Sequence, residues 1–108
     1  MMIKEFAEKY GVSRRDIDYW TNCGLLHPRV MSNGYRDYGQ RAEDEMQNIL
    51  VAMMIDEPGS IESKCEKLNC YGSEEWGVLA EKLNETKKRI VRKYNSAYET
   101  ASKRSQGG

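Results

Sequence analysis

Four arginines and three tyrosines in one short stretch carry chemistry suited to binding phosphate groups. They are Arg14, Arg15, Tyr19, Arg29, Tyr35, Arg36 and Tyr38. A guanidinium group offers a planar fork of N–H donors to a phosphate or to a guanine edge, and a tyrosine hydroxyl donates to phosphate oxygens. This set of side chains indicates contact with a nucleic acid, provided that the fold brings them to one surface.

A short helix is expected to begin directly after Ser13. Gly11 tolerates the positive φ of a tight turn, and the Ser13 hydroxyl can accept from backbone N–H groups as a helix N-cap. Arg14 and Arg15 then lie at the positively polarised start of the helix, where basic side chains are unfavourable for the helix itself. We therefore expect them to have a partner outside the helix. Gly24 is expected to end it as a left-handed cap.

A β-hairpin should follow this helix. Pro28 favours an extended segment, and Asn33-Gly34 is a strong hairpin-turn signal. The basic and aromatic residues around this turn are Arg29, Tyr35, Arg36 and Tyr38. A helix with basic residues beside a hairpin with basic and aromatic residues is an arrangement by which proteins grip a DNA duplex.

The spacing of apolar residues predicts the remaining helices. A helix over residues 2–10 completes a helix-turn-helix, and a helix from Gln40 to about Ile55 should cover it. Ser60 is a suitable N-cap for a further helix, whose apolar face includes Cys65. The predicted fold class is mainly α: a winged helix-turn-helix with a small β-hairpin wing, two further helices and a long C-terminal helix.

The segment 73–103 is predicted to be one long dimerisation helix. Its apolar residues recur every three or four positions and include Trp76, Leu79, Leu83, Ile90 and Tyr94. About thirty helical residues form a rod of roughly 45 Å, which projects beyond a domain of this size. We expect the stripe to pair with a second copy as a coiled coil, the alternative being a helix folded back on its own domain. Residues 104–108 are expected to be a disordered tail.

Composition narrows the class of protein. The 108 residues suffice for one small domain, and 17 basic residues balance 17 acidic ones. The charges are segregated, because residues 1–41 hold seven basic and five acidic residues whereas residues 42–75 hold two and nine. No apolar run is long enough to span a bilayer, so we expect a cytoplasmic protein without a membrane partner.

The three cysteines are rival candidates for chemistry. Cys23, Cys65 and Cys70, with His27, could form a metal site, but their spacing carries no recognisable ligand motif. We interpret Cys23 and Cys65 as small core residues and expect no metal and no cofactor. A thiol sensor at Cys70 stays an alternative. No phosphate-binding glycine loop or nucleophile elbow is present, so an enzyme is not expected.

Five motifs in order resemble the MerR family of bacterial transcription regulators. They are Ile3-Lys4-Glu5-Phe6-Ala7, Gly11-Val12-Ser13, Tyr19-Trp20, Gly24-Leu25-Leu26-His27-Pro28 and Gly34-Tyr35-Arg36-Asp37-Tyr38. Each motif is weak alone, but the ordered set at matching spacing is specific. The resemblance implies a winged-helix DNA-binding domain over residues 1–72 and an antiparallel dimerisation helix over 73–103. It also implies a short form of the family, without a separate effector domain.

The resemblance further implies roles for single residues. Ser13 and Arg15 would face the major groove at the start of the recognition helix, and Tyr19 would contact the phosphate backbone. Arg36 and Tyr38 would clamp the backbone from the wing. The supporting contacts would come from Arg14, Arg29 and Tyr35. The function implied is that of a homodimeric transcription regulator on a palindromic operator in double-stranded DNA.

One residue in the recognition helix departs from the family pattern. The family often has an arginine just before its aromatic pair, whereas this chain has Asp18. The change removes an expected phosphate contact and replaces a positive side-chain charge with a negative one.

Two alternatives for the winged helix stay open: an accessory factor in DNA excision, or a module that binds a protein such as a chaperone partner. Any effector is expected to be a small organic ligand or a protein that acts near Tyr71 and Trp76.

Overall fold

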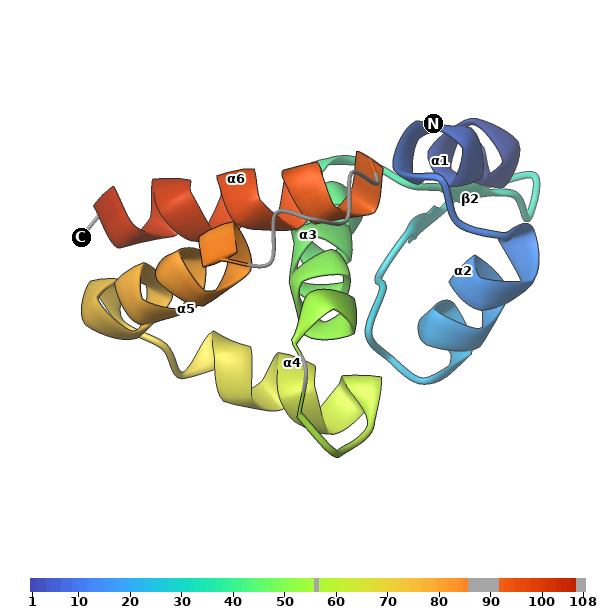
Figure 1. The fold of residues 1–108 in the computed structure, drawn as a ribbon. Helices are drawn as coiled ribbons and strands as arrows, with labels where there is room; N and C mark the ends of the chain where they lie inside the picture. Colours follow the sequence, from blue (N-terminus) through green and yellow to red (C-terminus); the bar gives the residue numbers. More distant parts are fainter. Residues whose placement is uncertain (56, 86–91, 107–108) are drawn as a thin grey trace. The chain divides into compact units, whose positions relative to one another are not determined.

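The structure is a computed structural model that describes residues 1–55, 57–85 and 92–106. Figure 1 shows the elements in order, and the mainly helical prediction is confirmed. They are α1 (Ile3–Tyr10), α2 (Arg14–Asn22), β1 (Arg29–Val30), β2 (Arg36–Asp37), α3 (Gln40–Met54), α4 (Ile61–Asn69), α5 (Ser73–Glu85) and α6 (Arg92–Gln106). None of the helices in the described part of the chain has the length and apolar character needed to cross a membrane.

The chain forms two compact units, residues 1–46 and residues 47–108. The division falls inside α3, whereas the sequence placed a boundary after residue 72. Each unit has its own buried side chains.

The turn between α1 and α2 is built from the residues that predicted it. Gly11 ends α1 with a φ of 64°, in the left-handed region that favours glycine. Ser13 Oγ accepts a hydrogen bond from the backbone N–H of Asp16 at 3.0 Å and so caps α2. Because this cap fixes the start of α2, Arg14 and Arg15 lie in its first turn, and both side chains are exposed.

The wing is a two-stranded antiparallel hairpin with a three-residue loop. Its cross-strand partners are Arg29 with Asp37 and Val30 with Arg36. The Gly34 N–H donates to the Met31 carbonyl at 2.9 Å, and the Met31 N–H donates to the Tyr35 carbonyl at 2.7 Å. Gly34 has a φ of 86°, which a loop of this kind requires at its third position. The turn signal at Asn33-Gly34 is therefore confirmed.

An aromatic pair forms the centre of residues 1–46. Phe6 and Tyr38 are fully buried, and their rings stack with centroids 4.9 Å apart. The Thr21 hydroxyl donates to the Ile17 carbonyl at 2.7 Å, so the Tyr38 hydroxyl, 3.2 Å from Thr21 Oγ1, acts as the donor to it. The other buried apolar residues of this unit are Ala7, Val12, Ile17, Trp20, Leu26, Ala42 and Met46. The pair thus joins α1 and α2 to the residue that follows β2.

Glu43 ties the start of α3 to the end of α1. Its carboxylate accepts hydrogen bonds from the Lys9 ammonium and from the Tyr10 hydroxyl, the latter at 3.1 Å. The hydrogen bond from Lys9 is the main cause that lowers the pKa of Glu43 below its usual 4.5. Burial, and after it the hydrogen bond to Glu43, raises the pKa of Tyr10.

In residues 47–108, α5 packs side by side with α6 (Figure 1). The start of α5 meets the end of α6, because the Arg104 guanidinium lies 4.6 Å from the centroid of the Trp76 ring. A Cβ added to Gly77 would lie 3.7 Å from Cβ of Ser105, so the two helices run antiparallel. The buried residues of α5 are Trp76, Leu79, Ala80 and Leu83, and those described in α6 are Ala97, Thr100 and Ala101.

The prediction of one continuous helix over residues 73–103 is wrong. The structure has two helices, α5 ending at Glu85 and α6 beginning at Arg92. The predicted dimerisation residues Trp76, Leu79 and Leu83 are buried within a single chain. The physical reason is that an apolar stripe can be covered by a neighbouring segment of its own chain as well as by a second copy.

The end of α6 lies where a disordered tail was expected. Residues 104–106 were expected to be a disordered tail, but they belong to α6. Arg104 also donates a hydrogen bond to Asn48 Oδ1, which helps to hold the end of this helix. Ile90, the side chain of Tyr94 and residues 107–108 lie outside the described residues.

We predict that Glu43→Gln destabilises the protein at neutral pH but not in acid. Because the pKa of Glu43 is lowered on folding, its contribution is present above the unfolded value and is lost as the pH falls through the folded value. The loss near pH 7 should be about 0.5–1 kcal/mol, as for other partly exposed ion pairs. Thermal unfolding followed by circular dichroism should show the two proteins converging as the pH falls through the lowered pKa of Glu43. A difference that is constant with pH would contradict this account.

Candidate nucleic-acid interface

One face of α2 is buried and the other is exposed. Ile17 and Trp20 pack inward, whereas Arg14, Arg15 and Tyr19 are exposed on the other side of the helix. Tyr19 is 56% exposed, which is unusual for an aromatic residue of this size. The predicted contact residues of α2 therefore share an accessible surface with the capping Ser13.

An ion pair brings the wing against this exposed face. The Arg36 Nη1 atom of β2 donates to the Asp18 Oδ1 atom of α2 at 3.0 Å. Both side chains are accessible, Arg36 at 38% and Asp18 at 58%. The structure thus places the predicted wing arginine beside α2, with an acidic residue as its partner.

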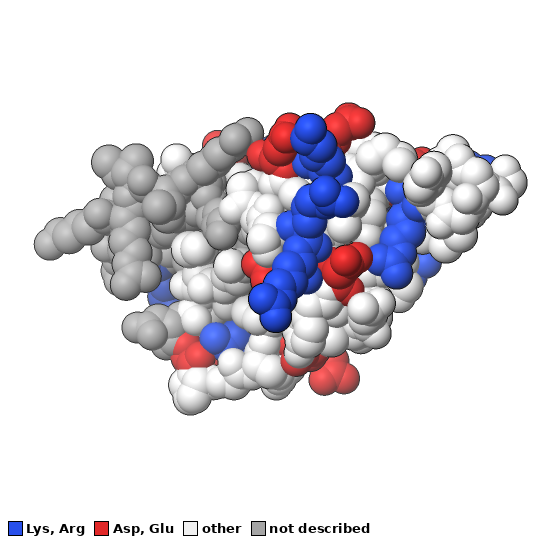
Figure 2. Space-filling view, turned by 90° about the vertical axis from the view of Figure 1, so that its right-hand side faces the viewer, with Lys and Arg blue, Asp and Glu red and all other residues white. Residues whose placement is uncertain are grey.

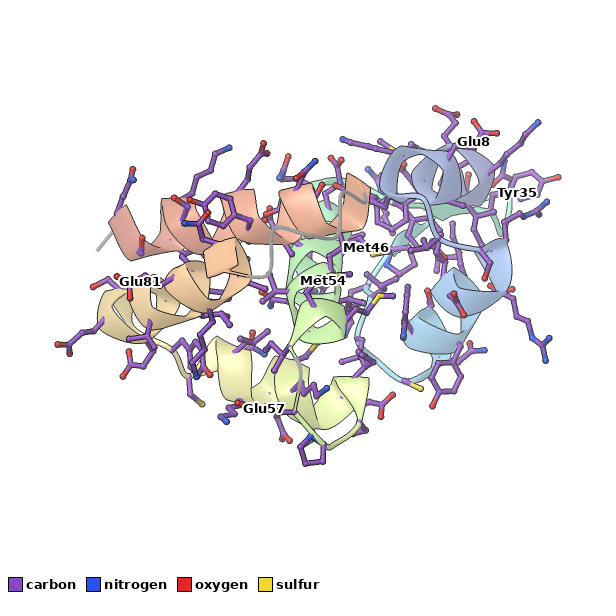
Figure 3. All side chains as sticks on the ribbon, viewed as in Figure 1. Glu8, Tyr35, Met46, Met54, Glu57 and Glu81 are labelled. Carbon is purple, nitrogen blue, oxygen red and sulfur yellow. The ribbon has the colours of Figure 1, made fainter. Side chains whose placement is uncertain are left out.

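The outer part of the wing carries exposed apolar and aromatic side chains. Val30, Met31 and Tyr35 are exposed, and Tyr35 points away from the hairpin (Figure 3). Arg29 is exposed on β1. The structure therefore leaves the predicted wing contacts Arg29 and Tyr35 accessible to a partner.

Lys4 is a further basic residue of this region and is not among the predicted DNA contacts. It lines a surface depression together with Arg14, next to the turn between α1 and α2. Figure 2 views this side of the molecule, and Lys and Arg side chains form an elongated band there with acidic side chains beside it. The signal in the sequence was only one lysine on the polar face of an amphipathic helix, which is common on any protein surface.

Glu45 of α3 holds the segment that leads into the wing. Its carboxylate accepts from the His27 backbone N–H at 2.8 Å, and the other oxygen lies 2.5 Å from His27 Nδ1. Arg41 Nε lies 3.7 Å from that same oxygen. Local sequence patterns could not reveal this contact, because its partners are 18 residues apart.

The structure corrects the prediction for Tyr38. Its side chain is fully buried against Phe6, and its hydroxyl is bonded to Thr21, so it does not face the surface that carries Arg36. The physical reason is that β2 ends at Asp37, and the alternation that would place residues 36 and 38 on one face does not continue beyond the strand. Tyr38 positions the wing instead of contacting a ligand.

The three cysteines differ in exposure. Cys65 is buried as predicted, and burial raises its pKa to about 11, which makes it a poor nucleophile. Cys23 was predicted to be a core residue but is exposed, as is Cys70. Nowhere in the described ranges do three potential ligand side chains converge on a point that could hold a metal ion.

Residues 47–108 contain a cavity of about 320 Å³ close to the position expected for an effector. Its walls are mainly apolar, with three charged residues among them. They are Met54, Ile55, Glu57, Tyr71, Glu75, Val78, Leu79, Lys82 and Leu83. Figure 3 labels Met54 and Glu57, which come from the end of α3 and from the segment that follows it.

Comparisons with known proteins bear on residues 1–53. The family described as MerR HTH family regulatory protein matches this range. Residues 1–53 are a MerR-family helix-turn-helix domain. The HTH-type transcriptional regulator CueR of Bacillus subtilis (strain 168) is 45% identical over 40 residues. That stretch is 37% of this chain and 28% of CueR, so the chain matches less than a third of this relative. No solved structure matches the chain.

The MerR domain contains every residue for which a DNA contact was predicted. It spans α1, α2, the hairpin and nearly all of α3, which ends at Met54. The match to a family of regulatory proteins also supports the expectation that the chain is not an enzyme.

We predict that Tyr38 contributes to the stability of the MerR domain and not to ligand contact. Tyr38→Phe removes one buried hydrogen bond and should lower the free energy of unfolding by about 1 kcal/mol. Tyr38→Ala also removes the stacked ring and should cost about 3–5 kcal/mol. Urea unfolding measures both values, and DNA affinity of Tyr38→Phe should equal that of the wild type below its unfolding midpoint. A selective loss of DNA affinity in Tyr38→Phe would restore the contact role.

Proposed function

We propose that this chain is a transcription regulator that binds double-stranded DNA through the exposed face of α2 and the wing. The single observation that carries the proposal is the position of Arg14, Arg15 and Tyr19 on one accessible face of α2, with Arg36 of the wing beside it. An exposed helix of this kind fits the width of the major groove. Its first turn also presents backbone N–H groups, which favour negative charge.

The basic residues divide into two roles under this proposal. Arg15 lies in the first turn of α2, where side chains of a recognition helix reach base edges. Arg36 and Arg29 belong to the hairpin, and hairpin wings flank the recognition helix and contact the phosphate backbone. Base contacts give sequence preference and phosphate contacts give position, so the two classes of residue should differ when substituted.

We further propose that the protein acts as a homodimer on a palindromic operator. The family resemblance supports this arrangement, and so does an exposed apolar side chain of α5, Val78, beside an apolar cavity. Val78 is 54% exposed and lies on the wall of the apolar cavity in residues 47–108. Apolar surface of this kind is often covered by another molecule, and a second copy is the occupant that a two-fold symmetric operator requires.

An effector is proposed to occupy the same cavity. Its volume of about 320 Å³ suits a small organic molecule, and its lining is mainly apolar. This position beside Val78 would let a ligand alter the contact between the two copies. The effector and the dimer contact would then be coupled through one surface.

We predict that Arg15→Ala and Arg36→Ala weaken DNA binding in different ways. Arg15→Ala should cost about 1–3 kcal/mol and relax sequence preference at one position. Arg36→Ala should lower the affinity for all DNA sequences alike. It should also make the slope of log K against log salt concentration shallower by about one. Fluorescence anisotropy with a selected duplex and a random duplex, at several salt concentrations, measures both effects.

The matched control for these variants is Arg41→Ala, which removes an exposed arginine of α3 outside the proposed contact set. Its affinity for DNA should stay near that of the wild type. If all three variants and the wild type bind a protein partner but no duplex, the chaperone-partner type of function replaces the one proposed.

We predict that Val78→Asp yields a monomer. A charge at position 78 opposes burial of this side chain against a second copy, whereas the position is exposed enough that the folded chain should tolerate the charge. Asn84→Asp is the control, because it adds the same charge to another exposed position of α5. Sedimentation analysis should give a dimer for the wild type and for Asn84→Asp. A wild-type monomer at high micromolar concentration would refute the homodimer.

A further inference from the structure

Asp18 occupies a position where an acidic residue opposes phosphate binding. It lies on the exposed face of α2 that also carries Arg15 and Tyr19, which are one helical turn or less away. The Oδ1 atom of Asp18 accepts from Nη1 of Arg36, the wing residue that the proposed function assigns to the DNA backbone. The acid therefore contacts Arg36, a wing arginine that lies beside α2.

A carboxylate and a phosphate compete for the same donors. Both present oxygen acceptors to the planar fork of a guanidinium group, and both carry negative charge. A phosphate that approaches Arg36 must displace Asp18 or share the guanidinium with it, and in either case the two negative groups repel each other. The contact is solvent-accessible on both sides, so it is weak enough for a phosphate to break it.

Resting on the proposed function, we propose that Asp18 is a built-in competitor of the DNA phosphate that Arg36 binds. The pair neutralises Arg36 in the unbound protein and lowers affinity for every DNA sequence by a similar factor. Base contacts from α2 are not reduced, so they make up a larger share of the remaining binding energy. Asp18 thereby sets how tightly the protein binds any duplex, while the ratio of its affinities for the operator and for other DNA stays the same.

The test is a comparison of Asp18→Asn with Asp16→Asn. Both changes remove one negative charge from an exposed position of α2, but the two residues lie roughly 200° apart around the helix. Asp18→Asn should raise the affinity for a random duplex about two- to fivefold, which corresponds to one exposed ion pair. The salt dependence should become steeper by up to about one charge. Asp16→Asn should change either quantity clearly less.

A double-mutant cycle connects the effect to Arg36. In an Arg36→Ala background, Asp18→Asn should produce no larger gain than Asp16→Asn, because the group that Asp18 neutralises is gone. Asp18→Glu keeps the charge and should stay near the wild type. Thermal unfolding of each variant checks that the fold is retained, since both aspartates are exposed.

Each outcome of the cycle has a defined meaning. The proposal is overturned if Asp18→Asn and Asp16→Asn give equal gains in the wild-type background, or if Asp18→Asn gives the larger gain in the Arg36→Ala background. A loss of affinity in Asp18→Asn also overturns it, because Asp18 would then hold Arg36 in its DNA-binding position. Failure of the wild type and of all variants to bind any duplex refutes the proposed function itself.

Discussion

The stacking of Tyr38 on Phe6 is the interaction on which the geometry of the N-terminal unit depends. Tyr38 follows β2, Phe6 belongs to α1, and the Tyr38 hydroxyl donates to Thr21 of α2. One buried side chain thus fixes three segments that are distant in the sequence. The exposed arginines of α2 and the wing have a defined spacing only because this contact holds the elements that carry them. Glu45 adds a second tie by holding the segment around His27.

Local chemistry predicted the parts of this unit that depend on neighbouring residues. Gly11, Ser13 and Gly34 act through their own backbone or through a residue three positions away, so their roles were visible in the sequence. Tyr38 was misjudged because its environment is set by Phe6, which is 32 positions away. The prediction that Cys23 is buried was wrong for a related reason. Apolar character alone does not determine whether a small residue at the end of a helix is buried or exposed.

The C-terminal half shows a different limit of sequence reasoning. A stripe of apolar residues at helical spacing indicates that a helix packs against an apolar partner. It does not indicate which segment supplies that partner. Here the buried residues of α6 include the small Ala97 and Ala101, those of α5 include the larger Leu79 and Leu83, and Gly77 of α5 lies near Ser105 of α6. Such complementary sizes were present in the sequence and favour close packing of two helices. The same antiparallel contact could be made between copies, so the stripe is compatible with a monomer and with a dimer.

The separation between a buried and an exposed face of α2 explains how a chain of zero net charge can present the surface proposed to bind DNA. Ile17 and Trp20 supply the packing, and exposed positions such as Arg15, Asp18 and Tyr19 add little to it. Charges on the exposed face can therefore change with small effects on stability. Because phosphate attraction falls with distance and salt, the local arrangement of these charges matters more than the total for the chain. A single acid beside Arg36 can then tune binding without altering the fold.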